Sequence, residues 1–397
     1  MFRHAAAVFV ALVLSLLAVL NVLQADRSFS EHENRYLQEF PAFSLERLVS
    51  GTFGREFDQY IQDQFPFRDR WIALKTLAER AAGRRDNGRI YFGRDGFLLV
   101  MDPESDPDRL ARNSEALRQL LATLMTRHPG LSASILLVPT APEVRPDLLP
   151  PHAPVPSPEF VAESVRSLLG CETPGAVGPG SCSVVDLLSA LRTAAAGPDA
   201  PSLYYRTDHH WTTAGAFEAY RAWARAAGIQ PSERDDFEIR PVSDRFFGTT
   251  WSSAHVLSLP PDRIDAWTAP WQDGLEIRVQ DGPWGPGSLY HPEFLGKKDQ
   301  YAYFLGGNQA SVDIRTGAGT GRTLLLIRDS YANSVVPFLV RHFDRLLVLD
   351  PRHLNVPVDR YLDGLPDFEP TDFLFLARAS SFGRNSEFGR LAGGAGS

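Results

Sequence analysis

Thr323-Leu-Leu-Leu-Ile-Arg-Asp-Ser-Tyr331 is the stretch that decides the fold. Its unbroken apolar run predicts a strand over 323–327 that is buried on both faces, as in the sheets of α/β proteins. The Asp-Ser pair predicts a turn into a helix over 331–340. Asp329-Ser330 alone is typical of a helix N-cap, yet such a turn is also where α/β proteins present a nucleophile. Ser330 is therefore a candidate nucleophile at the carboxyl edge of a strand.

Apolar strands alternate with amphipathic helices on both sides of this stretch. We expect helices over 107–127, 187–195 and 214–227, and strands over 133–138, 184–186, 346–349 and 373–377, with a hairpin over 89–100. This alternation predicts an α/β fold in which a mostly parallel sheet is covered by helices on both faces. Residues 246–320 are rich in Trp, Gly and Pro and break the pattern, so we expect an irregular insertion there.

Asp208-His209-His210-Trp211 is the second informative stretch. In an extended segment, alternate residues point to the same side. The Asp208 carboxylate can then reach the Nδ1–H of His210 and leave Nε2 free as a base. His209 is expected to point away from Asp208. With Ser330, this pair would complete a Ser-His-Asp triad.

A hydrogen-bonded structural pair and a metal site are the alternatives for the adjacent histidines. No further His or Cys lies around them at the spacing of metal ligands, which argues against zinc. We therefore expect neither a metal nor a cofactor.

The Asp-His-His-Trp run resembles the signature of the bacterial DHHW family, which is related to the SGNH-hydrolase-like periplasmic alginate O-acetyltransferases. Further similarity lies in Ser30-Glu-His-Glu-Asn-Arg35, Asp63-Gln-Phe-Pro-Phe-Arg-Asp-Arg-Trp71 and Arg328-Asp-Ser-Tyr-Ala-Asn-Ser334. The resemblance covers most of residues 26–380. It implies an SGNH-hydrolase-like fold.

The resemblance also implies roles for particular residues. Asp208 would orient His210, His210 would act as the base and Ser330 as the nucleophile, with the Asp-x-His pair preceding the serine as in this family. Arg328 departs from the wider SGNH pattern, in which Gly often precedes Asp-Ser. Because of that departure, the resemblance does not determine the geometry of the local turn or of the part of the oxyanion hole that the turn would form.

Composition and the N-terminal segment set the outer limits. The chain has 397 residues, 44% of them hydrophobic, and a formal net charge of −8. It has no basic run, so we expect no nucleic-acid partner. The uncharged stretch from Ala5 to Leu23 is long enough to cross a bilayer. Arg3 precedes it, which predicts that the remainder lies outside the cytoplasm.

The expected organisation has four parts. They are 1–25 as a membrane anchor or signal segment, 26–85 as a juxtamembrane helical segment, 86–385 as the acyltransferase domain and 386–397 as a disordered tail. Leu23 stands where a signal peptidase needs a small residue, which favours an uncleaved anchor. Helical spacing over 53–82 predicts two amphipathic helices interrupted by Pro66. Cys171 and Cys182 are either disulfide-bonded or unpaired.

Four further residues are candidates for substrate or oxyanion contacts. Trp211, next to His210, is the first candidate for stacking on a sugar ring, although large aromatics more often pack in cores. Asn308 follows two glycines and can offer an amide to an oxyanion, or simply belong to a turn. Tyr331 and Asn333 follow the candidate nucleophile.

The sequence therefore predicts a membrane-anchored, extracytoplasmic serine acyl-transfer enzyme that O-acetylates a cell-surface or secreted polysaccharide. An acetylesterase and a non-catalytic polysaccharide-binding or assembly protein are the alternatives. Because acetyl-CoA is cytoplasmic, a transferase outside the cytoplasm needs an acetyl supplier. The resemblance implies that a membrane-bound O-acyltransferase has this role.

Overall fold

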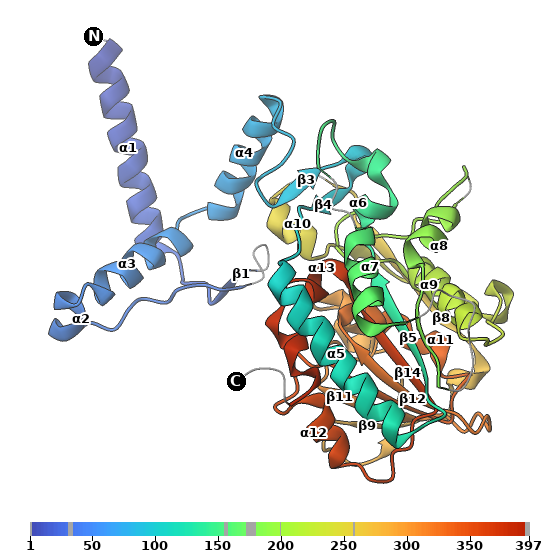
Figure 1. The fold of residues 1–397 in the computed structure, drawn as a ribbon. Coiled ribbons are helices and arrows are strands. Elements are labelled where there is room, and N and C mark those ends of the chain that lie inside the picture. The colour runs from blue at the N-terminus through green and yellow to red at the C-terminus, as the bar shows by residue number, and fades with distance from the viewer. Residues whose placement is uncertain are drawn as a thin grey trace. The chain divides into compact units, whose positions relative to one another are not determined.

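The computed structural model describes residues 2–30, 35–154, 158–171, 180–198, 200–256 and 259–393 (Figure 1). The chain divides into two compact units. Met1–Ile90 with Thr249–Leu259 forms one, here called the N-terminal unit, and Tyr91–Gly248 with Pro260–Ser397 forms the other, here called the sheet unit.

An eight-stranded sheet is the centre of the sheet unit, with strand order β10-β9-β11-β13-β12-β14-β5-β6. The strands are β5 (Ser132–Val138), β6 (Cys182–Val184), β9 (Glu276–Val279), β10 (Gly285–Pro286), β11 (Ser311–Arg315), β12 (Thr323–Arg328), β13 (Arg345–Leu349) and β14 (Asp372–Arg378). The segment from β13 to β6 is parallel. The remaining pairs, from β13 through β11 and β9 to β10, are antiparallel.

The apolar run of β12 explains why the sheet is buried on both faces. Leu324 and Leu326 belong to one hydrophobic cluster, whereas Leu325 and Ile327 belong to another, because successive side chains of a strand point to opposite faces. Helices α8 (Leu187–Ala194) and α9 (Thr213–Ala226) contribute to the first cluster, and α5 (Pro107–Arg127) and α7 (Pro158–Leu169) to the second. The predicted α/β class with helices on both faces is confirmed.

Shorter elements complete the sheet unit. They are β3 (Ile90–Phe92), which reaches the unit boundary, η1 (Arg94–Gly96), β4 (Leu98–Val100), α6 (Ala141–Val144), η2 (Pro146–Leu148), η3 (Arg234–Asp236), β7 (Glu238–Phe246), β8 (Asp262–Thr268), η4 (Pro270–Gln272), η5 (Pro292–Phe294), η6 (Gln300–Tyr303), α12 (Val358–Asp363) and α13 (Ala379–Phe382). Strands β3 and β4 pair where the hairpin was predicted.

The stretch 246–320 is not an irregular insertion throughout, which corrects the prediction. It contains β8, which pairs with β7, and it contains β9, β10 and β11, which extend the main sheet. The strands escaped recognition because they are short and carry charges. Asp313, for example, is buried in β11, where Arg278 and Arg345 form ion pairs with it across both neighbouring strands.

Two further predictions need correction. The helix expected over 331–340 is a 3-10 turn, η7 (Ser330–Ser334), followed by the short α11 (Val336–Leu339). Residues 386–391 of the expected disordered tail form η8 (Ser386–Leu391), because Phe388 and Leu391 are buried in the second cluster. The final residues, 394–397, lie outside the described part of the chain.

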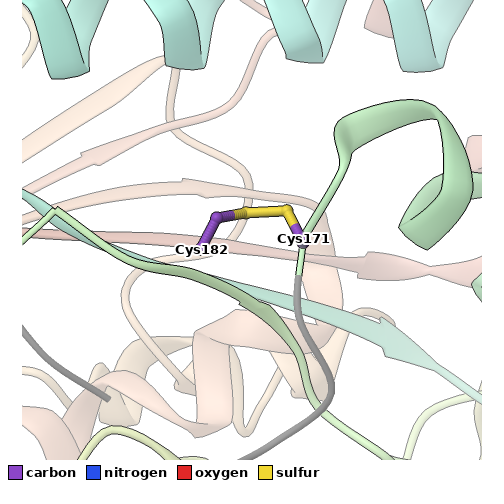
Figure 2. The surroundings of a disulfide bond; sticks show 2 residues. All are labelled: Cys171 and Cys182. Carbon is purple, nitrogen blue, oxygen red and sulfur yellow. A yellow bond between two sulfur atoms is a disulfide. The ribbon is translucent and has the colours of Figure 1, made fainter. Parts of the chain in front are cut away.

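A disulfide joins Cys171, just after α7, to Cys182, the first residue of β6 (Figure 2). Their Cα atoms are 4.9 Å apart. Of the two open alternatives for these cysteines, the structure has the bonded one. The loop residues 172–179 lie outside the described residues.

The N-terminal unit is built from helices and one small strand pair. Its elements are α1 (Phe2–Leu23), β1 (Phe29–Ser30), β2 (Arg35–Tyr36), α2 (Leu45–Val49), α3 (Thr52–Asp63), α4 (Arg68–Ala81) and α10 (Thr249–Ala254). Helices α3 and α4 are the two predicted on either side of Pro66. By length and composition, α1 can cross a membrane.

Two of the sequence motifs meet inside this unit. Arg35 forms a bidentate ion pair with Asp63, whose side chain is fully buried. Burial alone would raise the pKa of Asp63, but the hydrogen bonds from Arg35 and from the Gln38 N–H lower it to about 2. These residues therefore stabilise the fold. Residues 31–34 of the first motif lie outside the described residues.

Candidate active site

Ser330 begins η7 directly after β12, at the carboxyl edge of the parallel strands. Asp329 is the N-cap: its Oδ1 accepts the Tyr331 N–H at 3.0 Å, and its Oδ2 accepts the Arg378 N–H at 2.8 Å. Arg378 is the last residue of β14, the neighbouring strand. The capping aspartate thus ties two strand ends together and fixes where Ser330 stands.

Asp208 and His210 lie in a bend that is flanked by a bridge between Tyr204 and Trp211. The Asp208 Oδ1 accepts the backbone N–H of His210 at 2.9 Å and lies 2.5 Å from its Nδ1. This is an Asx-type turn. The predicted contact between the side chains is present, but a turn makes it, and not the alternation of an extended strand.

His210 connects this bend to the end of β12. Its Nε2 lies 2.8 Å from the Ser330 Oγ, across a sequence separation of 120 residues. Both Asp208 and His210 are buried, and Ser330 is partly exposed. The structure therefore brings the three predicted residues into one line of hydrogen-bonded contacts that ends at an accessible hydroxyl.

His209 lies beside Asp208, contrary to the prediction that it points away. Its Nδ1 is 3.7 Å from Asp208 Oδ1, and its ring centroid is 3.9 Å from that of His210. Burial and the neighbouring His210 lower the pKa of His209 to about 3, so its imidazole is neutral at physiological pH. Burial favours protonation of Asp208, but the two histidines more than offset this and hold its pKa well below the usual range.

Tyr301 supports His210 and had no signal in the sequence. The two rings are stacked with centroids 3.9 Å apart and planes 9° apart. The Tyr301 hydroxyl hydrogen-bonds to Ser334 Oγ at 3.0 Å. Because Tyr301 comes from η6, within the stretch expected to be irregular, no local pattern connected it with the site.

Trp211 and Tyr331 have structural positions, which corrects their prediction as substrate contacts. Trp211 is 0% exposed, and its Nε1–H is shared by the Tyr331 carbonyl and Ser334 Oγ, each at 3.0 Å. The Tyr331 hydroxyl donates to the His209 carbonyl. These bonds join the Asp-x-His bend to η7, so both residues fix the position of His210 relative to Ser330. A fully buried indole has no face for a sugar.

Asn308 and Asn333 belong to a network around Arg328. The buried Arg328 guanidinium donates to Asn308 Oδ1 at 3.1 Å and to the Gln309 carbonyl at 3.2 Å, and forms an ion pair with Asp350. Asn333 is buried and also donates to Asn308 Oδ1. Asn308 itself is exposed. Arg328, the departure from the SGNH pattern, therefore fixes the loop that carries Asn308.

The other tryptophans of the sheet unit pack rather than line the site. Trp267 is buried. Arg341 lies over Trp271, and Arg315 and Arg278 lie over Trp284, with the nearest guanidinium 4.1 Å from a ring centroid. Packing thus accounts for these aromatic faces.

Glu143 is a buried carboxylic acid near the carboxyl end of β5, the strand that pairs with β14. Glu143 follows β5 in α6, and its carboxylate accepts the Thr140 N–H as part of a capping box. Burial raises its pKa to about 7, and the nearby Asp102 acts in the same direction. Asp102 is itself paired with Arg378.

Asp208, His209 and His210 are also a possible set of metal ligands, since one atom of each lies within 4.8 Å of the others. However, Nδ1 and Nε2 of His210 both take part in the contacts described above. Metal binding through His210 would break one of them. This geometry favours the Ser-His-Asp arrangement.

Fold and site together define an α/β protein of the SGNH-hydrolase-like class. Residues 90–250 match a family profile described as "SGNH hydrolase-like domain, acetyltransferase AlgX", and residues 179–349 match one described as "DHHW protein". The chain is similar to the DHHW family over residues 179–349, the range that contains the Asp-His-His-Trp run and Ser330, and to the SGNH hydrolase-like acetyltransferases over residues 90–250, as the sequence motifs predicted. At the level of the family, this relationship supports O-acetyltransferase activity.

Solved structures share the fold. A DHHW family protein from Eubacterium siraeum has 21% identity and a TM-score of 0.60, over 76% of this chain and 97% of that one. PatB1 from Bacillus cereus, whose structure carries a sulfonyl adduct, has 17% identity and a TM-score of 0.58, over 75% of this chain and 96% of that one. No curated protein sequence matches the chain.

Proposed function

We propose that this protein is a serine-dependent O-acetyltransferase that modifies a polysaccharide. One observation carries the proposal: the contact of 2.8 Å between Ser330 Oγ and His210 Nε2, with Asp208 on the other ring nitrogen. A nucleophile, a base and a group that orients the base, all within hydrogen-bonding reach, constitute the arrangement that acyl transfer requires. The relationship to the AlgX acetyltransferases supports acetyl as the transferred group.

In this mechanism His210 Nε2 takes the proton of Ser330 as Oγ attacks the acetyl carbonyl. The tetrahedral intermediate collapses, the bond to the donor breaks, and the donor oxygen leaves with the proton from His210. A sugar hydroxyl then gives its proton to His210 and attacks the acetyl-serine. Collapse of the second intermediate releases the acetylated sugar and returns the proton to Ser330. Asp208 stabilises each imidazolium stage.

Two donors are proposed for the oxyanion. The Ser330 N–H opens η7, and N–H groups in the first turn of a helix lack an intrahelical acceptor. The second is Asn308. Since a guanidinium can only donate, the contact with Arg328 identifies the atom facing Arg328 as Oδ1, so the Asn308 NH₂ group points elsewhere. An exposed amide held in this way is a suitable oxyanion donor.

We further propose that α1 anchors the protein in a membrane and that both units lie on the outer side. The length and apolar composition of α1 support the anchor, and Arg3 before it supports the orientation. An acetyl supplier is then required, and the family resemblance indicates a membrane-bound O-acyltransferase. The relatives of the family indicate a cell-surface or secreted polysaccharide as the acceptor.

An acetylesterase with the same residues is the second candidate, because water can replace the sugar hydroxyl in the second step. The two differ only in how well the acceptor competes with water. A non-catalytic binding protein would have no need for Ser330 and His210 to be in contact, so their distance argues against that alternative.

Turnover of a chromogenic acetyl ester, with and without an oligosaccharide acceptor, tests the proposal. We expect release of the chromophore, with acetyl appearing on the saccharide when it is present. Acetate as the product in both cases would favour the esterase. No turnover by the wild-type protein and by the Ser330→Ala variant alike would favour the binding protein.

A further inference from the structure

The N-terminal unit exposes large apolar side chains that the sheet unit would bury. None of the described residues in the range 2–90 belongs to any of the three hydrophobic core clusters. Outside α1, this unit instead exposes Tyr36, Phe40, Phe43, Leu45, Leu48, Val49, Ile61, Phe67, Trp71, Leu74 and Leu77. Extended exposed apolar surface of this kind marks an interaction site.

Helix α4 shows the pattern most clearly. Trp71, Leu74 and Leu77 recur every three residues, which places them along one side of the helix, and they are 48%, 51% and 56% exposed. The side chains that α4 buries are the small ones, Ala73 and Thr76. A helix of a water-soluble domain normally buries its large apolar side chains and exposes its small or polar ones. The large apolar face of α4 therefore lacks a partner within the described protein.

Helix α1 indicates what covers this face. No part of His4–Asn21 is buried in the protein, although it is apolar enough to cross a bilayer. At its end, Asn21 donates to the Gln64 carbonyl, just after α3. Arg27 then contacts Gln64 at 3.0 Å and Asp69, in the first turn of α4, at 2.9 Å. The start of α4 is thus held close to the point where α1 ends.

The charges of α4 also suit a membrane surface. The helix carries Arg68, Arg70, Lys75 and Arg80 against Asp69 and Glu79, in a chain whose net charge is −8. Basic side chains beside an apolar face with a tryptophan are typical of helices that lie in the interface of an anionic bilayer. The guanidinium of Arg70 lies over the ring of Phe67, at the edge of the apolar face.

We propose that α4 lies in the surface of the bilayer that α1 crosses. Its apolar face enters the boundary between headgroups and acyl chains, and its basic side chains contact lipid phosphates. This proposal rests on the membrane anchoring of α1 and is independent of the acetyl-transfer chemistry. A second attachment beside a single helix restricts how far the N-terminal unit can tilt against the membrane.

Quenching by brominated lipid tests this arrangement in the full chain. Leu74→Cys is labelled with bimane and reconstituted in vesicles of phosphatidylethanolamine and phosphatidylglycerol, with or without brominated acyl chains. Cys171 and Cys182 are disulfide-bonded and take no label. Leu12→Cys in α1 is the control within the bilayer. Val279→Cys in β9, 42% exposed, is the control for an apolar position in water.

We expect the Leu74 and Leu12 labels to lose most of their fluorescence and the Val279 label to keep it. If the Leu74 label is quenched no more than the Val279 label while Leu12 is quenched, the inference is overturned, and a second copy or a protein partner covers α4. If Leu12 is not quenched either, the anchor and the inference both fail. Acetyl-ester turnover by the same samples separately reports on the proposed chemistry.

Discussion

Helices α9 and α4 are both amphipathic, yet they use their apolar faces in opposite ways. In the sheet unit, α9 buries Phe217, Tyr220 and Trp223 in a hydrophobic cluster. In the N-terminal unit, α4 buries Ala73 and Thr76 and exposes its large apolar side chains. An apolar stripe in a sequence thus predicts a helix, but it does not say whether protein or lipid covers the stripe. We expect changes in the sheet unit to affect chemistry and folding, and changes on α4 to affect membrane contact.

Among variants that keep the nucleophile Ser330, the largest effect is expected from Asp208→Asn. The substitution removes the charge that stabilises the imidazolium and can fix the wrong tautomer of His210, and the equivalent change in a serine protease costs about 10⁴-fold in kcat. We predict a loss of similar order in kcat for an acetyl ester, with membrane association unchanged.

His209→Ala is the matched control for Asp208→Asn. Its imidazole is neutral, and the contact with Ser330 Oγ is made by His210 Nε2, so the loss should be much smaller. Equal losses in the two variants, together with bound metal in the wild type, would support the metal site instead.

Replacing one tryptophan in each unit should have different effects on the free energy of unfolding. Trp211 is fully buried, so Trp211→Ala should lower the free energy of unfolding by about 3–5 kcal/mol. Trp71 is half-exposed, and Trp71→Ala should change it by no more than about 0.5 kcal/mol in detergent. Denaturant titrations of both variants provide the measurement. A large loss from Trp71→Ala would mean that α4 packs against protein.

Two buried carboxyls, one in each unit, should respond to pH in opposite directions. The folded-state pKa of Glu143 is raised from 4.5 to about 7, so its proton stabilises the fold below pH 4.5 and this contribution is lost as pH rises through 7. The loss amounts to about 3 kcal/mol. The pKa of Asp63 is lowered from 3.8 to about 2, so its contribution is present above pH 3.8 and lost as pH falls through 2.

Unfolding free energies of wild type, Glu143→Gln and Asp63→Asn across this pH range check both signs. Glu143→Gln should remove the decline above pH 4.5, whereas Asp63→Asn should reduce the decline in acid. An unchanged profile for Glu143→Gln would show that this carboxyl ionises without cost in the folded state.

The smallest effect on kcat is expected from Tyr301. Its ring stacks on His210, and such contacts contribute about 1 kcal/mol, equivalent to a change of roughly fivefold to tenfold in rate. Tyr301→Leu should lower kcat by about this factor and leave KM unchanged. Tyr301→Phe keeps the ring and should restore most of kcat. If kcat is lowered equally in Tyr301→Phe and Tyr301→Leu, the hydrogen bond from the Tyr301 hydroxyl to Ser334 contributes to kcat and the stacking on His210 does not.

The periodic parts of the fold were predictable from sequence. Alternating side chains of β12 fill two clusters, and the helical spacing from Pro107 to Arg127 gives α5 with the expected bounds. Strands β9 to β11 were missed because charged residues such as Asp313 are buried there with partners from other strands. Such pairing is visible only after the chain has folded.

The candidate site was predictable in its residue types but not in its surroundings. Asp208, His210 and Ser330 stand out by their chemistry and their local sequence. The place of His209 depends on an Asx turn, the burial of Trp211 on its bonds to η7, and the stacking of Tyr301 on a contact between distant segments. None of these three contacts leaves a periodic or motif signal in the sequence.

Trapping the acetyl group on the protein is the most direct test of the central claim, that Ser330 is the nucleophile. Wild type and Ser330→Ala are mixed with a chromogenic acetyl ester, quenched in acid and digested, and the peptides are mapped by mass spectrometry. We expect acetyl on Ser330 in the wild type, its loss when a saccharide acceptor is added before the quench, and none in Ser330→Ala. Ester turnover that persists in Ser330→Ala, or an acetyl group on a different residue that turns over, would contradict it.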